Sequence, residues 1–128
     1  MRALATVFLA VVLAGCASSS GTSSPGRQRD LITFEEIANS NVGTAYEVIE
    51  KLRPEYLRTR GSVSPLRSAE PERAVVYIDG VRSGGPDALR NIPRESVQEV
   101  RYLNGSDATT MYGTGHGGGA IQIRTRRG

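Results

Sequence analysis

Two places in the sequence hold residues that could bind a ligand or take part in a reaction: a glycine-rich stretch over residues 113–119 and the cysteine Cys16. The stretch reads Gly-Thr-Gly-His-Gly-Gly-Gly and contains His116, the only histidine of the chain. Glycine runs let backbone amides approach an anion, but phosphate loops run from a strand into a helix and include Gly-Lys-Ser/Thr. This stretch is predicted to leave a helix and enter a strand, so we expect no phosphate site.

His116 has no second histidine and no nearby cysteine that could complete a transition-metal site. A general base would also need a nucleophile and an orienting carboxylate, and the sequence nominates neither. We therefore expect no enzyme activity, no cofactor and no metal site. We interpret His116, Gly117 and Gly118 as part of an exposed loop that could contact a ligand or a partner.

Cys16 lies at the end of an apolar segment, residues 3–14, that follows the basic residue Arg2. A basic start followed by a short apolar run is typical of a secretory signal peptide. The run is too short to cross a bilayer, which takes ~20 apolar residues in a helix. Because the chain has one cysteine, a disulfide within the chain is excluded.

Leu13-Ala14-Gly15-Cys16 resembles the lipobox of bacterial lipoproteins, in which the cysteine is lipidated and becomes the new N-terminus. That resemblance implies that Cys16 is a membrane anchor, and several acyl chains at one end give stable attachment. Ala17 at the next position is compatible with outer-membrane sorting in such lipoproteins. We expect a signal peptide over 1–15, the lipidated cysteine and a flexible linker over 16–30, and a folded domain over 31–128 facing the periplasm.

The formal charge of the chain is +3, and removing Arg2 with the leader lowers it by one, to +2. This surplus is too small to indicate a polyanionic partner, so we expect no nucleic acid. The segment from Ala17 to Arg29 is rich in Ser, Gly and Thr, and such a coil reaches on the order of 20 Å. About a hundred residues then remain for one small core.

The folded part is expected to open with two short helices. Thr33 and Glu36 form a predicted capping box for a helix through Ala38, and Thr44 can cap a second helix that ends before Pro54. Its apolar residues recur at helical spacing: Ala45, Val48, Ile49 and Leu52. We also predict a short strand over 57–60 and a loop over 61–72.

The second half alternates strands with short helices. β-Branched and aromatic residues predict a strand over 74–78, which Asp79-Gly80 turns back into Val81 and Arg82. Residues 86–92, 93–96 and 106–112 predict a short helix, a turn and a helix. Strands are predicted over 97–103, where Val97 is out of phase with Val100, and over 120–126. The fold class is small α+β, with a short mixed sheet of about three to four strands.

Several motifs of this half occur together in a known family, in the order Val76 to Gly80, Ile92-Pro93, Val97 to Leu103, Ala108 to Gly113, and Gly119 to Ile123. The pattern resembles the plug domain of TonB-dependent outer-membrane receptors. The resemblance covers the last half of the chain well, and the opening around Ile32 to Ile37 more loosely. It implies that Asp79, Gly80, Tyr112, Gly113 and Gly119 are fold-motif residues.

Elementary backbone chemistry explains these motif residues. Asp79-Gly80 makes a tight hairpin turn, and Gly113 can adopt the left-handed conformation that ends a helix after Tyr112. Gly117 to Gly119 let the backbone pass close to its neighbours before the last strand. These roles are structural rather than catalytic.

A receptor needs a barrel of many transmembrane strands after the plug, and this sequence ends at Gly128. We therefore expect a plug-like domain without a barrel, which is not a transporter by itself. Our first hypothesis is an accessory module that binds an outer-membrane receptor barrel or a periplasmic protein. The alternative is a module that binds a small molecule or glycan through the loops 61–72 and 113–119, with a groove supplied by Tyr77, Tyr102 and Tyr112.

Overall fold

The computed structural model describes residues 29–59 and 72–126, and the signal, lipidation and linker predictions for residues 1–28 lie outside these ranges. The first range holds strand β1 (Leu31–Ile32), helices α2 (Phe34–Asn39) and α3 (Ala45–Leu52) and the 3-10 turn η1 (Pro54–Leu57). The second range holds β2 (Val75–Ile78), β3 (Val81–Gly84), η2 (Pro86–Asn91), η3 (Arg94–Ser96), β4 (Val97–Leu103), α4 (Gly105–Tyr112) and β5 (Ala120–Thr125).

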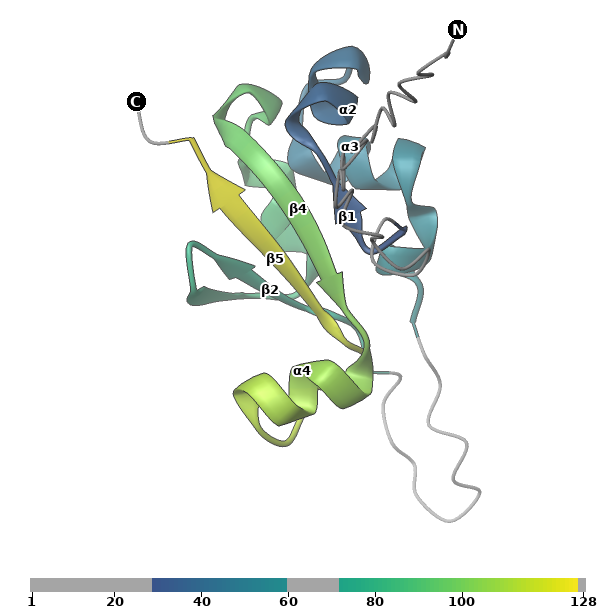
Figure 1. Cartoon of the computed structure of the whole chain (residues 1–128), viewed down its shortest axis with the longest axis vertical. Helices are drawn as coiled ribbons and strands as arrows, with labels where there is room; N and C mark the ends of the chain where they lie inside the picture. The colour runs from purple at the N-terminus through teal and green to yellow at the C-terminus, as the bar shows by residue number, and fades with distance from the viewer. Residues whose placement is uncertain (1–28, 60–71, 127–128) are drawn as a thin grey trace, which may run out of the picture.

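The strands form one mixed sheet of five strands in the order β1-β4-β5-β2-β3 (Figure 1). The pairing of β2 with β5 is parallel, and the other three pairings are antiparallel. The predicted α+β class with a mixed sheet is confirmed, with one strand more than expected. The extra strand includes only Leu31 and Ile32, which are too few residues to show an alternating pattern in the sequence.

Both predicted helix starts are confirmed as capping boxes. The Thr33 side chain accepts from the backbone N–H of Glu36, whose carboxylate accepts from the Thr33 N–H at 2.9 Å. Thr44 and Glu47 repeat the arrangement at the start of α3. Each box satisfies amides that the first helical turn leaves without a partner, and so fixes where these short helices begin.

The predicted strand over 57–60 is wrong. Residues Pro54–Leu57 form a 3-10 turn, since proline presets the dihedral angle of its first position, and Arg58 and Thr59 pair with no strand. Tyr56 is the residue that holds this turn: it is buried, stacks on Tyr102 at 4.7 Å and donates its hydroxyl to the Arg29 carbonyl. Burial raises the pKa of the Tyr56 phenol. The predicted loop over 61–72 lies outside the described residues except for Glu72.

The main core lies between the sheet and the helices α2 and α3, which occupy one of its faces (Figure 1). Its fully buried side chains include Ile32, Ile37, Ile49, Leu89, Ile121 and Ile123. A smaller apolar cluster lies on the other face under α4, and comprises Val75, Tyr77, Ala108 and Ala120 with Leu103 and Tyr112 against them. The helices α2 and α3 therefore cover most of one face of the sheet, and α4 covers only part of the other.

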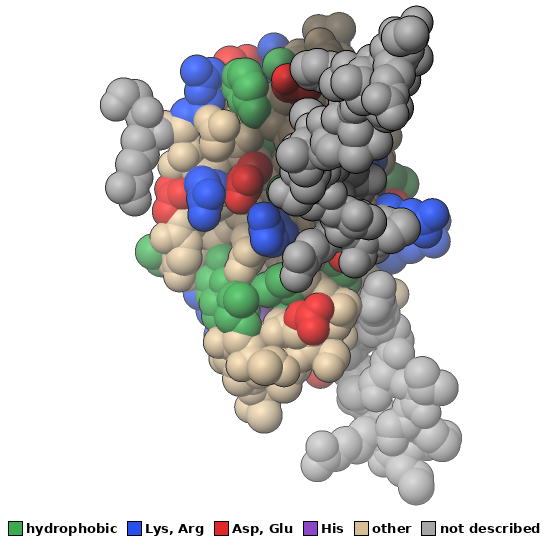
Figure 2. Space-filling view, in the orientation of Figure 1, with side chains coloured by type: hydrophobic (Ala, Val, Ile, Leu, Met, Phe, Trp, Pro, Cys, Tyr) green, Lys and Arg blue, Asp and Glu red, His purple; other side chains and the backbone are tan. Residues whose placement is uncertain are grey.

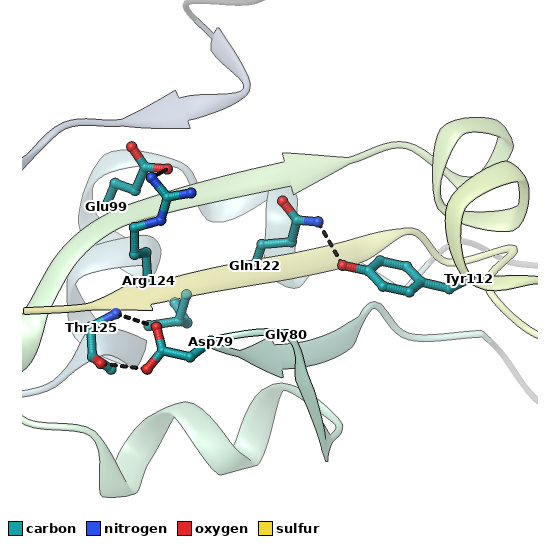
Figure 3. A pocket seen from close by; sticks show the side chains of 8 residues that line it. Asp79, Gly80, Glu99, Tyr112, Gln122, Arg124 and Thr125 are labelled. Atoms are coloured by element: carbon teal, nitrogen blue, oxygen red, sulfur yellow. Dashed lines mark hydrogen bonds and ion pairs between the residues drawn. The ribbon is translucent and has the colours of Figure 1, made fainter.

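A register shift in β4 explains the broken alternation of its sequence. The pairing with β5 slips between Val97 and Glu99, so that two residues of β4 take the place of one. Val97 and Val100 are consequently both buried against the main core, at 1% and 0% exposure. The irregularity also directs the Glu99 side chain to the partly covered face of the sheet (Figure 3).

Shortening one buried side chain of the central strand β5 tests this assignment of the core. We expect Ile121→Ala, at a position with 0% exposure, to lower the free energy of unfolding by about 3 kcal/mol because it leaves a cavity between sheet and helices. Chemical denaturation of the full chain in detergent measures the change. Val81→Ala, at a position 68% exposed, is the matched control and should cost less than about 0.5 kcal/mol. Equal losses for the two variants would contradict the assignment.

Candidate functional site

The Asp79-Gly80 turn does more than reverse the chain between β2 and β3. Both residues have positive φ angles, +48° and +85°, as the predicted two-residue hairpin turn requires. The Asp79 carboxylate also accepts from the Thr125 backbone N–H at 2.9 Å and from the Thr125 hydroxyl. The turn thereby fastens the end of β5 to the hairpin.

Tyr112 ends α4 and fixes that helix to the sheet. Its ring stacks on Tyr77 of β2, with ring centroids 3.9 Å apart, and its hydroxyl accepts from the side-chain N–H of Gln122 at 2.6 Å. Gly113 follows with φ +90°, a conformation that favours glycine, and its N–H is bonded to the Thr109 carbonyl. The sequence prediction of a helix that ends at Tyr112-Gly113 is confirmed.

His116 is not exposed, and our expectation for this residue is wrong. It is only 5% exposed, its Nδ1 lies 2.9 Å from the Gly113 carbonyl oxygen, and its Nε2 lies 2.8 Å from the Tyr77 hydroxyl. A carbonyl only accepts, so Nδ1 donates to Gly113, and Nε2 shares the second hydrogen bond with the Tyr77 hydroxyl. Because both ring nitrogens are hydrogen-bonded, His116 holds the glycine-rich loop in place and does not face a ligand as a base. We call this pair of hydrogen bonds the His116 clamp.

The glycines after His116 lie where a side chain has no room. A Cβ at Gly118 would fall 2.6 Å from backbone atoms of Glu72 and Arg73, and one at Gly119 would fall 2.5 Å from the Leu103 carbonyl oxygen. Gly117 faces the flexible Glu72 carboxylate instead, and remains exposed. The predicted close passage of the backbone is therefore confirmed most clearly at Gly118 and Gly119.

A groove of about 430 Å³ lies on the partly covered face, at a position that the sequence did not indicate (Figure 3). Its floor is β5, its sides are Tyr112 and the Asp79-Gly80 turn, and Glu99 reaches it from β4. Arg124 lies over Glu99 with 3.6 Å between nitrogen and oxygen. Of the three tyrosines that the sequence offers for a groove, Tyr112 lines this one, whereas Tyr77, Tyr102 and the loop 113–119 do not.

Charge on the surrounding surface is mixed. Basic and acidic side chains are interspersed over the face shown in Figure 2, with no extended area of one sign. Among residues 29–59 and 72–126 no group of three His, Cys, Asp or Glu side chains could hold a metal ion. In the same part of the chain no helix has the length and apolar character needed to cross a membrane.

These features define the class of the protein: it is a small α+β domain whose last strand, β5, lies in the middle of a mixed sheet and is reached through a tightly packed glycine loop. The chain belongs to the TonB-dependent receptor plug domain family, whose model matches residues 21–120. This places it among modules related to outer-membrane receptors.

One solved structure shows the same fold. The chain is similar to the ferric enterobactin receptor of Pseudomonas aeruginosa, solved as a single-site mutant in complex with enterobactin, with 20% identity and a TM-score of 0.52. The match covers 76% of this chain and 17% of the receptor chain. A comparison with curated proteins found no match.

Adding one carbon at Gly118 tests the close packing of the loop. We expect Gly118→Ala to destabilise the domain by at least about 2 kcal/mol, because the backbone of Glu72 and Arg73 cannot move aside as a side chain can. Gly85→Ala is the control: its φ is −88° and nothing lies near its added carbon, so we expect a change within about 0.5 kcal/mol. Thermal unfolding of both variants measures these changes in stability. A Gly118→Ala protein as stable as the wild type would contradict the close packing of the loop.

Removing one hydroxyl tests the His116 clamp. Tyr77→Phe leaves the buried Nε2 without its partner, and we expect a loss of about 1 kcal/mol in unfolding free energy. Tyr46→Phe, at a half-buried ring that lies under Arg90, should change stability by less than about 0.5 kcal/mol. A Tyr77→Phe variant as stable as the wild type would show that the hydrogen bond to His116 is not made.

Proposed function

We propose that the protein is a lipid-anchored accessory module of the cell envelope, and that its plug-like domain binds an outer-membrane receptor barrel or a periplasmic protein. The observation that carries the proposal is the plug family match over residues 21–120, on a chain whose start has the organisation of a lipoprotein signal. The domain faces the periplasm, attached to the outer membrane through Cys16.

The arrangement of polar side chains supports a non-enzymatic role. Both ring nitrogens of His116 are used by Gly113 and Tyr77, so the only histidine is not available as a base. The Asp79 carboxylate accepts two hydrogen bonds from Thr125.

The lipid anchor supports a role in binding rather than in free diffusion. A segment of about a dozen small and polar residues between Cys16 and the folded part would let the domain reach partners on the order of 20 Å from the membrane surface. Anchoring confines the domain near outer-membrane proteins, which raises its effective concentration for a partner in the same membrane.

Fractionation and capture test the two parts of this proposal separately. We expect the wild-type chain to incorporate labelled palmitate and to sediment with outer membranes, and Cys16→Ser to lose both properties. Ser18→Ala is the control that should keep them. Retention of label and sedimentation by Cys16→Ser would refute the anchor.

Affinity capture from native envelopes then tests the partner. We expect the wild-type protein to retain a receptor barrel or a periplasmic protein in larger amount than the Gly118→Ala variant, whose fold we predict to be destabilised. Recovery of no protein above the level of that variant would contradict the accessory role while leaving the anchor unaffected.

A further inference from the structure

The groove on the partly covered face combines the fold-motif residues Asp79, Gly80 and Tyr112 with charged and polar side chains that are not part of the fold motif. Its floor carries Gln122 and Arg124 of β5, with Glu99 beside them and the Tyr112 ring at one side (Figure 3). The floor from Gln122 to Thr125 extends about 10 Å at strand spacing, a length that suits one small molecule.

A positive and a negative group lie side by side in this groove. The Arg124 guanidinium and the Glu99 carboxylate are 3.6 Å apart, which is an ion pair but longer than a good hydrogen bond. The Arg124 side chain is 71% exposed and that of Glu99 is 27% exposed. Each group therefore keeps hydrogen-bonding capacity for a ligand, and a guanidinium can bind a carboxylate through two parallel N–H donors.

We propose that this groove binds an α-amino acid, with the ligand carboxylate on Arg124 and the ligand ammonium on Glu99. A ligand with a single charge would cover both protein groups but leave one of them without a partner, which costs free energy. An α-amino acid carries the two charges on groups bonded to the same carbon and can satisfy both. The inference does not rest on the proposed function.

The remaining lining residues indicate the type of side chain. Gln122 donates to the Tyr112 hydroxyl at 2.6 Å, so these two residues hold each other in place at the end of the groove. The stacking of Tyr112 on Tyr77 further fixes its ring. A ring held in this way offers a rigid apolar surface, which favours an aromatic or aliphatic ligand side chain over a charged one.

L-Phenylalanine is a suitable probe, titrated into the ¹⁵N-labelled full chain in detergent micelles and followed by NMR. We expect saturable shifts at the amides of β5 and at Tyr112. N-Acetyl-L-phenylalanine lacks the ammonium and L-phenylalaninamide lacks the carboxylate, so each should bind about tenfold more weakly or worse.

Charge-removing variants show whether the groove is the site. Arg124→Gln and Glu99→Gln should each raise the Kd for L-phenylalanine by about tenfold or more, with otherwise unchanged spectra. Arg58→Gln removes an equal charge from an exposed position outside the groove and should leave the Kd unchanged. The proposal is overturned if L-phenylalanine gives no saturable shifts, if the two derivatives bind equally well, or if Arg58→Gln weakens binding as much as Arg124→Gln.

Discussion

The parallel pairing of β2 with β5 is the contact on which the rest of the domain depends. β5 is the only described strand that joins β1 and β4 on one side to the β2–β3 hairpin on the other. It reaches this position through the glycine loop, where the Val75 N–H donates to the Gly119 carbonyl at 3.0 Å. A side chain at Gly118 would meet the backbone of Glu72 and Arg73 just before β2, and one at Gly119 would meet β4 at Leu103, so the approach to β5 requires glycine at both positions.

The same pairing divides the second face of the sheet into two parts. Near the start of β5, Ala120 packs with Val75, Tyr77 and Ala108 under α4, and the His116 clamp holds the loop over this cluster. Toward the end of β5, Gln122 bonds to Tyr112 at the last position of α4, Arg124 lies further along the strand, and the two residues form the groove floor. A short α4 therefore stabilises one half of the face and leaves the other half accessible.

Local patterns in the sequence predicted the parts of this structure that depend on neighbouring residues. The capping boxes, the Asp79-Gly80 turn and the strands β2, β4 and β5 follow from residue types within a few positions of each other. The groove could not be predicted in this way, because Glu99 meets Arg124 only through the register of β4 on β5, which includes a shift. The burial of His116 could not be predicted, because glycine-rich loops are usually exposed. Here the ring is hydrogen-bonded to the hydroxyl of Tyr77, a residue of β2 that is distant in sequence.

Membership of the plug family and the glycine-dependent strand pairing together indicate that β5 organises one cooperative domain. Amide hydrogen exchange of the full chain in detergent micelles tests this claim most directly. We expect the hydrogen-bonded amides of β5 and β2 to be the best protected of all, with one common free energy of opening equal to that of global unfolding. Exchange of the β5 amides as fast as those of the edge strand β3, with β2 still protected, would contradict it.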